Sequence, residues 1–157
     1  MTLPSSEEAS CERKEWQMDK EKLWKRFQKH MGYTDEEMKI FRSDPLKVKM
    51  VTESPDFVKS RIIAEVIESQ GCHAQHRVGQ KFVLDGNGQL ITKECPEKMC
   101  VFAVAALESP VNKIYERFMA KSDPKHERTD VVQCSDIGIE KGGWGKILMK
   151  VYVESAR

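Results

Sequence analysis

Cysteine and histidine are the residue types in this chain with the widest chemistry, and four of them could share a site. Cys72 and His76 lie four residues apart in a glycine-bounded stretch, residues 71–79. Cys100 opens an apolar run, and Cys134 follows a short β-branched run. Thiolate and imidazole are ligands that zinc and iron–sulfur clusters prefer. The pattern predicts a metal site held by loops of different elements, since the chain has no C-x-x-C pair.

The same residues are compatible with two other kinds of protein. Cys100 near a helix start, or Cys72 beside His76, would make an activated thiolate with the histidine as its base. The protein would then be a stand-alone small enzyme acting on a small organic substrate. Free cysteine is also among the most buried residue types. The third alternative is therefore a metal-free protein-interaction module whose cysteines fill the core.

The other reactive side chains have weaker patterns around them. Cys95 directly precedes Pro96 and is interpreted as a helix-start residue, and Cys11 as incidental. His73 is expected to face solvent. Three further residues are candidates for lining a pocket: Arg77, Asp136 and Trp144.

Length and charge limit the class of protein. A chain of 157 residues, 39% hydrophobic and 32% charged, can form one domain, or one domain with an appendage. Its 26 Lys and Arg balance 25 Asp and Glu, so no global basic field indicates nucleic acid. No apolar run approaches the roughly 20 residues that span a bilayer. Five scattered cysteines behind a polar, acidic start favour reduced thiols. We expect a cytoplasmic protein with no nucleic-acid or membrane partner.

The first third of the chain is predicted to be helical. Residues 1–10 are polar and expected to be disordered. Residues 13–29 have helical periodicity with an aromatic stripe, and Gly32 fits the C-cap. Thr34 and Glu37 form a capping-box pattern for a helix reaching residue 41. This amino-terminal segment is predicted to comprise residues 1–56.

A third short helix should begin at Asp44-Pro45 and be closed by Pro55. The aromatic stripe of the first helix has two interpretations. It packs on the protein's own sheet, or it docks a partner subunit through the amino-terminal helices.

The remainder, residues 57–157, begins with strand patterns. Residues 61–67 are rich in β-branched side chains and predict a strand. Residues 81–84 and 89–92 flank an Asp-Gly-Asn-Gly turn and predict a hairpin.

Helices and two more strands follow the hairpin. Pro96 suits the first turn of a helix whose residues 99–107 are apolar nearly all round, so this helix should be buried. Ser109-Pro110 should break it before an amphipathic helix over residues 111–119. Residues 131–133 form a short strand candidate, and residues 147–153 alternate as a half-buried strand. The fold class is α+β, with a small, mainly antiparallel sheet packed with a buried helix.

Residues 58–154 resemble a family of small uncharacterised proteins found mostly in anaerobic bacteria and archaea. The matching features are Cys72-x-x-x-His76-x-Val78-Gly79, a cysteine-bearing apolar helix from Cys100, and Cys134-Ser135-Asp136. The family usually has Cys-Pro-Asp where this chain has serine in the middle. The resemblance implies that Cys72, His76, Cys100 and Cys134 form one shared feature, and that the setting is anaerobic metabolism.

The leading hypothesis from the sequence is a small metal- or iron–sulfur-binding accessory protein or enzyme subunit in anaerobic metabolism. Its ligands would be Cys72, His76, Cys100 and Cys134, and its cofactor an iron–sulfur cluster or zinc. The hypothesis requires the four side chains to meet around a common point.

Overall fold

The structure is a computed structural model that describes residues 20–53, 55–120 and 130–154. The chain divides into two compact units, Met1–Pro55 and Asp56–Arg157, which we call the helical unit and the sheet unit. This division differs by one residue from the boundary predicted between residues 56 and 57. The predictions for residues 1–10, for the first helix before residue 20, for Cys11 and for the aromatic residue Trp16 lie outside the described residues.

The part of the helical unit that the structure describes contains three consecutive helices. Residues 20–31 are helical, and α2 (Asp35–Arg42) and α3 (Pro45–Glu53) follow. Gly32 ends the first helix with φ +71°, the left-handed conformation expected of a glycine at this position.

The predicted capping box at the start of α2 is confirmed. The backbone N–H of Glu37 donates to Thr34 Oγ1 at 3.2 Å, and the N–H of Thr34 donates to Glu37 Oε2 at 2.8 Å. At the start of α3, Asp44 Oδ1 accepts the N–H of Leu46 at 2.9 Å.

The aromatic stripe of residues 20–31 packs inside the helical unit. The Trp24 ring lies 6.0 Å from the Phe27 ring and 6.4 Å from that of Phe41, edge-on in both cases. Phe27 also contacts Tyr33 in the turn before α2, at 6.2 Å. Trp24 is only 5% exposed. The described part of the stripe is therefore an internal contact surface between the first two helices.

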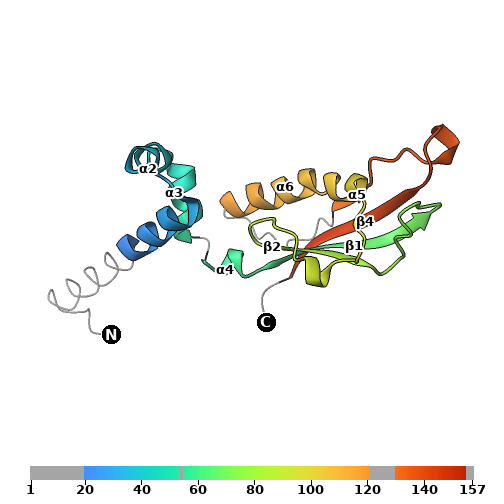
Figure 1. Cartoon of the computed structure of the whole chain (residues 1–157), viewed down its shortest axis with the longest axis horizontal. Helices are drawn as coiled ribbons and strands as arrows, with labels where there is room; N and C mark the ends of the chain where they lie inside the picture. The colour runs from blue at the N-terminus through green and yellow to red at the C-terminus, as the bar shows by residue number, and fades with distance from the viewer. Residues whose placement is uncertain (1–19, 54, 121–129, 155–157) are drawn as a thin grey trace, which may run out of the picture. The chain divides into compact units, whose positions relative to one another are not determined.

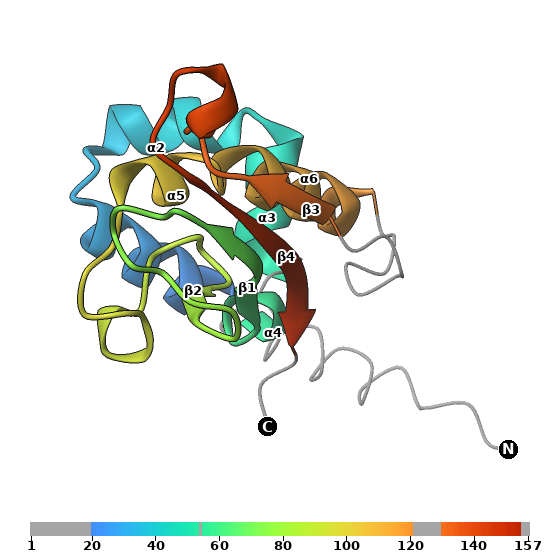
Figure 2. The same cartoon turned by 90° about the vertical axis from the view of Figure 1, so that its right-hand side faces the viewer.

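The sheet unit is built on a four-stranded antiparallel sheet, which confirms the α+β class. Its strands are β1 (Arg61–Gln70), β2 (Lys81–Asp85), β3 (Asp130–Gln133) and β4 (Lys146–Glu154). The spatial order is β2-β1-β4-β3, with β4 between β1 and β3 (Figure 2). The three predicted strands at 61–67, 131–133 and 147–153 all exist, and β1 runs three residues further than predicted.

Two helices, α5 (Val101–Ala105) and α6 (Glu108–Met119), lie over one face of this sheet (Figure 1). The alternation of β4 places every second side chain on that face, as its pattern predicted. The short helix α4 (Pro55–Val58) adds Phe57, whose ring stacks on Phe118 at 4.5 Å. The main buried side chains of this core are Ile62, Ala64, Val66, Phe82, Leu84, Ala103, Leu107, Ile114, Ile147, Met149 and Val151.

The predicted buried helix over residues 99–107 is wrong in extent and in burial. α5 has five residues, and residues 95–100 before it are not helical, so Pro96 does not open a helix. Within α5, Ala103 is 1% exposed, whereas Val101 and Phe102 are 69% and 54% exposed. An all-apolar helix that lies on one face of a sheet can bury only the side that faces the strands.

Pro55 lies two residues after the end of α3 at Glu53, as predicted, whereas Pro110, predicted to break a helix, stands near the start of one. Pro55 begins α4, and Pro110 lies in the first turn of α6, where it is buried. A proline is tolerated in a first turn because its missing N–H would have no partner inside the helix. The predicted break at Ser109-Pro110 is therefore wrong, and α6, rather than residues 99–107, is the long helix on the sheet.

The predicted hairpin is only half formed. Asp85 Oδ1 accepts the N–H groups of Asn87 and Gln89, both at 2.9 Å, which makes the expected tight turn. Beyond the turn, Leu90 makes a single bridge to Leu84, and residues 92–94 form a 3₁₀ turn. The strand partner of β2 is β1. Among the described residues no helix is long and apolar enough to cross a bilayer.

Candidate functional site

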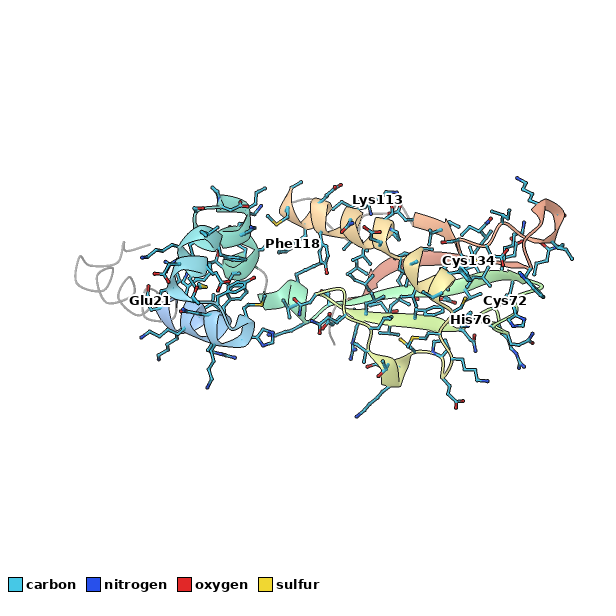
Figure 3. All side chains as sticks on the ribbon, turned by 45° about the horizontal axis from the view of Figure 1, so that its top comes forward. Glu21, Cys72, His76, Lys113, Phe118 and Cys134 are labelled. Carbon is cyan, nitrogen blue, oxygen red and sulfur yellow. The ribbon has the colours of Figure 1, made fainter. Side chains whose placement is uncertain are left out.

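The four predicted ligands gather at one end of the sheet unit. Figure 3 shows Cys72, His76 and Cys134 at the same end, far from Phe118 on α6. Cys134 belongs to the hydrophobic core cluster, and Cys72 and Cys100 pack against that cluster. The structure therefore places the four residues at one end of the sheet unit, and a shared metal site stays a prediction.

His76 is buried, with 3% of its surface exposed, and its ring makes internal contacts. Its Nε2 accepts the backbone N–H of Cys100, the N-cap of α5, at 3.3 Å. Its Nδ1 lies 3.4 Å from Gln80 Oε1, and the ring meets Phe82 edge-on at 5.1 Å. Since Nε2 accepts, the proton belongs on Nδ1, where it faces the Gln80 oxygen. His76 thus holds the start of α5 against the sheet.

The cysteines differ in what their sulfur atoms contact. Cys134 Sγ accepts the N–H of Ile147 at 3.4 Å. Cys95 Sγ accepts the N–H of Val83 at 3.3 Å, which ties residues 92–95 to the outer edge of β2. Cys95 is therefore not a helix-start residue: its thiol caps a strand edge.

No group of three or more His, Cys, Asp or Glu placed to hold a metal ion occurs in the part of the chain that the structure describes. The imidazole of His76 and the thiol of Cys134 instead accept backbone N–H groups. In this arrangement both side chains do what satisfied polar groups in a core do.

Asp136, predicted as a pocket-lining residue, organises the loop between β3 and β4. Its Oδ1 accepts the N–H of Gly138 at 2.9 Å and that of Trp144 at 3.1 Å. These donors, the Gly138 N–H first, hold the pKa of the carboxyl below its ordinary value of 3.8, although partial desolvation opposes them. A side chain at Gly143 would collide with Asp136 Oδ1, so the loop requires glycine there.

This loop and α5 together expose a set of large apolar side chains. The N–H of Ser135 donates to the carbonyl of Phe102 at 3.3 Å and joins the two segments. The ring of Trp144 also lies 5.6 Å from that of His73, which is exposed as predicted. We call the set the apolar tip; its members and exposed fractions are Val101 69%, Phe102 54%, Ile137 57%, Ile139 74% and Trp144 74%.

Of these five residues, only Trp144 was predicted from the sequence as a candidate for lining a pocket. The apolar pattern of residues 99–107 predicted that Val101 and Phe102 are buried, and no pattern pointed to Ile137 or Ile139. A usable signal was present: residues 137–145 combine three large apolar residues with four glycines, without helix or strand periodicity. Apolar residues in such a loop have no regular face on which to be buried.

Comparisons with protein-family models, with curated proteins and with solved structures found no match. The function is therefore inferred from the residues and their geometry. The resemblance of residues 58–154 to proteins of anaerobic microorganisms stays a prediction.

Replacing His76 tests its role as an internal acceptor. His76→Ala should lower the free energy of unfolding by about 3 kcal/mol, because it leaves a cavity beside Phe82 and a Cys100 N–H without its acceptor. His76→Gln can present an oxygen to the same N–H and should lose only about 1 kcal/mol. Urea denaturation measures both variants. Equal losses would show that the acceptor at Nε2 is unimportant.

Replacing Asp136 tests whether its carboxylate charge stabilises the loop, because that contribution to stability depends on pH. The depressed pKa means that the ionised carboxylate adds stability above about pH 3.8, and that this stability disappears as the pH falls through the folded-state pKa. Wild type should therefore be more stable than Asp136→Asn at pH 7, and the difference should shrink below about pH 4. Thermal unfolding at a series of pH values measures it. A difference that is constant with pH would contradict the role of the charge.

Proposed function

We propose that the protein is an interaction module that binds a partner protein through the apolar tip of its sheet unit. The observation that carries the proposal is the exposure of Trp144 and Ile139, each 74%, on a loop held by the Asp136 carboxylate. Three large apolar side chains, Ile137, Ile139 and Trp144, are exposed within this one loop. Exposed apolar surface of this kind commonly marks a protein-binding site, whereas single exposed residues do not.

The construction of the loop supports this proposal. Asp136 accepts two N–H groups, and the N–H of Gly143 donates to the carbonyl of Gly138 at 2.8 Å. A side chain at Gly145 would collide with the carbonyl of Gly71, so the loop also fits closely against the end of β1. A loop braced in this way loses little conformational entropy on binding. Tryptophan is among the residues that contribute most to binding energy in protein interfaces.

The described cysteines fit a module of this kind in the cytoplasm. Cys72, Cys95, Cys100 and Cys134 all carry free thiols. Reduced thiols are the rule in the cytoplasm. Packing of three of them on or in the hydrophobic cluster supports the view that they fill space in the core.

The test compares proteins recovered by the tagged full chain from cells of its source. The double variant Ile139→Thr, Trp144→Ser should lose a specific partner that wild type retains. With that partner purified, the variant should bind about 30-fold more weakly, as expected when a central interface residue is removed. Calorimetry or fluorescence anisotropy measures the affinity.

The matched control is Ile67→Thr, Val131→Thr, which changes two exposed apolar residues of β1 and β3 away from the tip. This control should retain the partner. If no protein depends on the tip residues, the proposal is wrong. If wild type sediments as a dimer that the tip variant abolishes, the partner is a second copy of the chain.

A second candidate is the metal- or iron–sulfur-binding accessory protein of anaerobic metabolism. It is favoured by one observation: Cys72, Cys100 and Cys134 all border one hydrophobic cluster, and Cys100 N lies 3.3 Å from His76 Nε2. To hold zinc or a cluster, these loops would have to move, and His76 would exchange its hydrogen bond to Cys100 for a bond to the metal.

Metal and acid-labile sulfide content, with a visible spectrum, tests this candidate on protein purified without oxygen. A genuine site should hold stoichiometric zinc, or iron with sulfide, and Cys100→Ser and Cys134→Ser should lower that content. Cys95→Ser is the matched control, because Cys95 Sγ bonds to β2 instead. Metal-free protein that unfolds cooperatively would exclude this candidate and favour the interaction module.

A further inference from the structure

We propose that the outer face of the helix at residues 20–31 binds an acidic segment of a partner protein. The surface consists of Lys22, Lys25, Arg26 and Lys29, which we call the basic row; all four are exposed. This surface belongs to the helical unit and is separate from the apolar tip.

The basic row lies on the side of the helix opposite its packed face. At 100° per residue, its four positions fall within an arc of about 100°. Leu23, Trp24 and Phe27 fall on the other side, where Trp24 and Phe27 contact aromatic rings of the same unit. Figure 3 shows long side chains projecting outward from this helix. The cations therefore point away from the unit's own core.

Among the described residues, the basic row lacks an ionic partner. No ion pair of Lys22, Lys25, Arg26 or Lys29 is found with any described residue. Cations three or four positions apart on a helix repel one another, and this row contains four such pairs. The helix thus carries a destabilising arrangement in a small unit whose described residues include few buried side chains, Trp24 and Met38. Attraction between these cations and an anionic partner would offset the repulsion among the cations.

The surroundings favour an acidic protein segment over other anions. The row is about 10 Å long, which matches about three or four residues of extended peptide. Beside its end, Gln28 Nε2 donates to Asp35 Oδ1 at 2.9 Å, so the acidic first turn of α2 lies close by. A long nucleic-acid strand would continue past the row into these carboxylates. A membrane would need the apolar face of the helix, but Trp24 is 5% exposed.

An open cleft adjoins the row and adds further cations. The cleft has a volume of about 520 Å³, and its walls include three cations, Lys25, Lys39 and Arg42, and two carboxylates, Glu21 and Asp35. The Arg42 guanidinium lies 4.9 Å from the centre of the Trp24 ring.

The test measures binding of a labelled glutamate-rich peptide of about ten residues to the full chain by fluorescence anisotropy. A variant without the four cations should bind the peptide at least about 10-fold more weakly at low salt. It carries Lys22→Gln, Lys25→Gln, Arg26→Gln and Lys29→Gln. Added salt should weaken binding of the peptide to wild type. The control changes four exposed residues of the sheet unit by the same charge: Lys59→Gln, Lys93→Gln, Lys98→Gln and Lys141→Gln. This control should bind like wild type.

Circular dichroism separates loss of binding from loss of structure. Because glutamine is a good helix former and the repulsion is gone, the basic-row variant should melt no lower than wild type. Equal weakening by both sets of substitutions, or no binding of the peptide at low salt, would overturn the proposal. So would tighter, row-dependent binding of a single-stranded oligonucleotide or of anionic lipid vesicles than of the peptide.

Discussion

The antiparallel pairing of β1 with β4 is the interaction on which the rest of the sheet unit depends. It runs from Arg61 opposite Glu154 to Gln70 opposite Lys146, with one irregularity after Val66. Since β4 also pairs with β3, all other strands are added to this pair. The pairing brings the end of β1 and the start of β4 together, where Gly71 and Gly145 approach closely. The loop after β1, which carries Cys72 and His76, begins at that point, and the loop between β3 and β4 ends there.

Two hydrogen bonds transmit this arrangement to α5. His76 accepts the N–H of Cys100 at the start of the helix, and the carbonyl of Phe102 accepts the N–H of Ser135. A five-residue helix has too few internal hydrogen bonds to persist alone. Its position, and hence part of the apolar tip, is set by loops from two distant parts of the chain. The helical unit differs in chemistry, since its exposed helix face is cationic. The two surfaces would suit an adaptor that contacts one partner through apolar packing and another through charge.

Much of the fold could be predicted because its signals are local. The capping box of Thr34 and Glu37 and the left-handed Gly32 depend on neighbours within a few residues. The period of two in β4 reflects a single buried face, so it predicts a strand without knowledge of the partner. The same holds for the β-branched run of β1. For the candidate site, the sequence indicated which loops carry Cys72 and His76 and, correctly, that His73 is exposed.

Composition, periodicity and caps by themselves determined the α+β class, the helical first third and the strands. Only the tertiary structure decided which surfaces are covered. An apolar run such as α5 does not show which of its sides meets the sheet, and Val101 and Phe102 lie on the side that faces solvent. Nor does a histidine reveal its partner: His76 bonds to an N–H 24 residues away. Burial and pairing depend on contacts between residues distant in the chain, and local patterns carry no information about them.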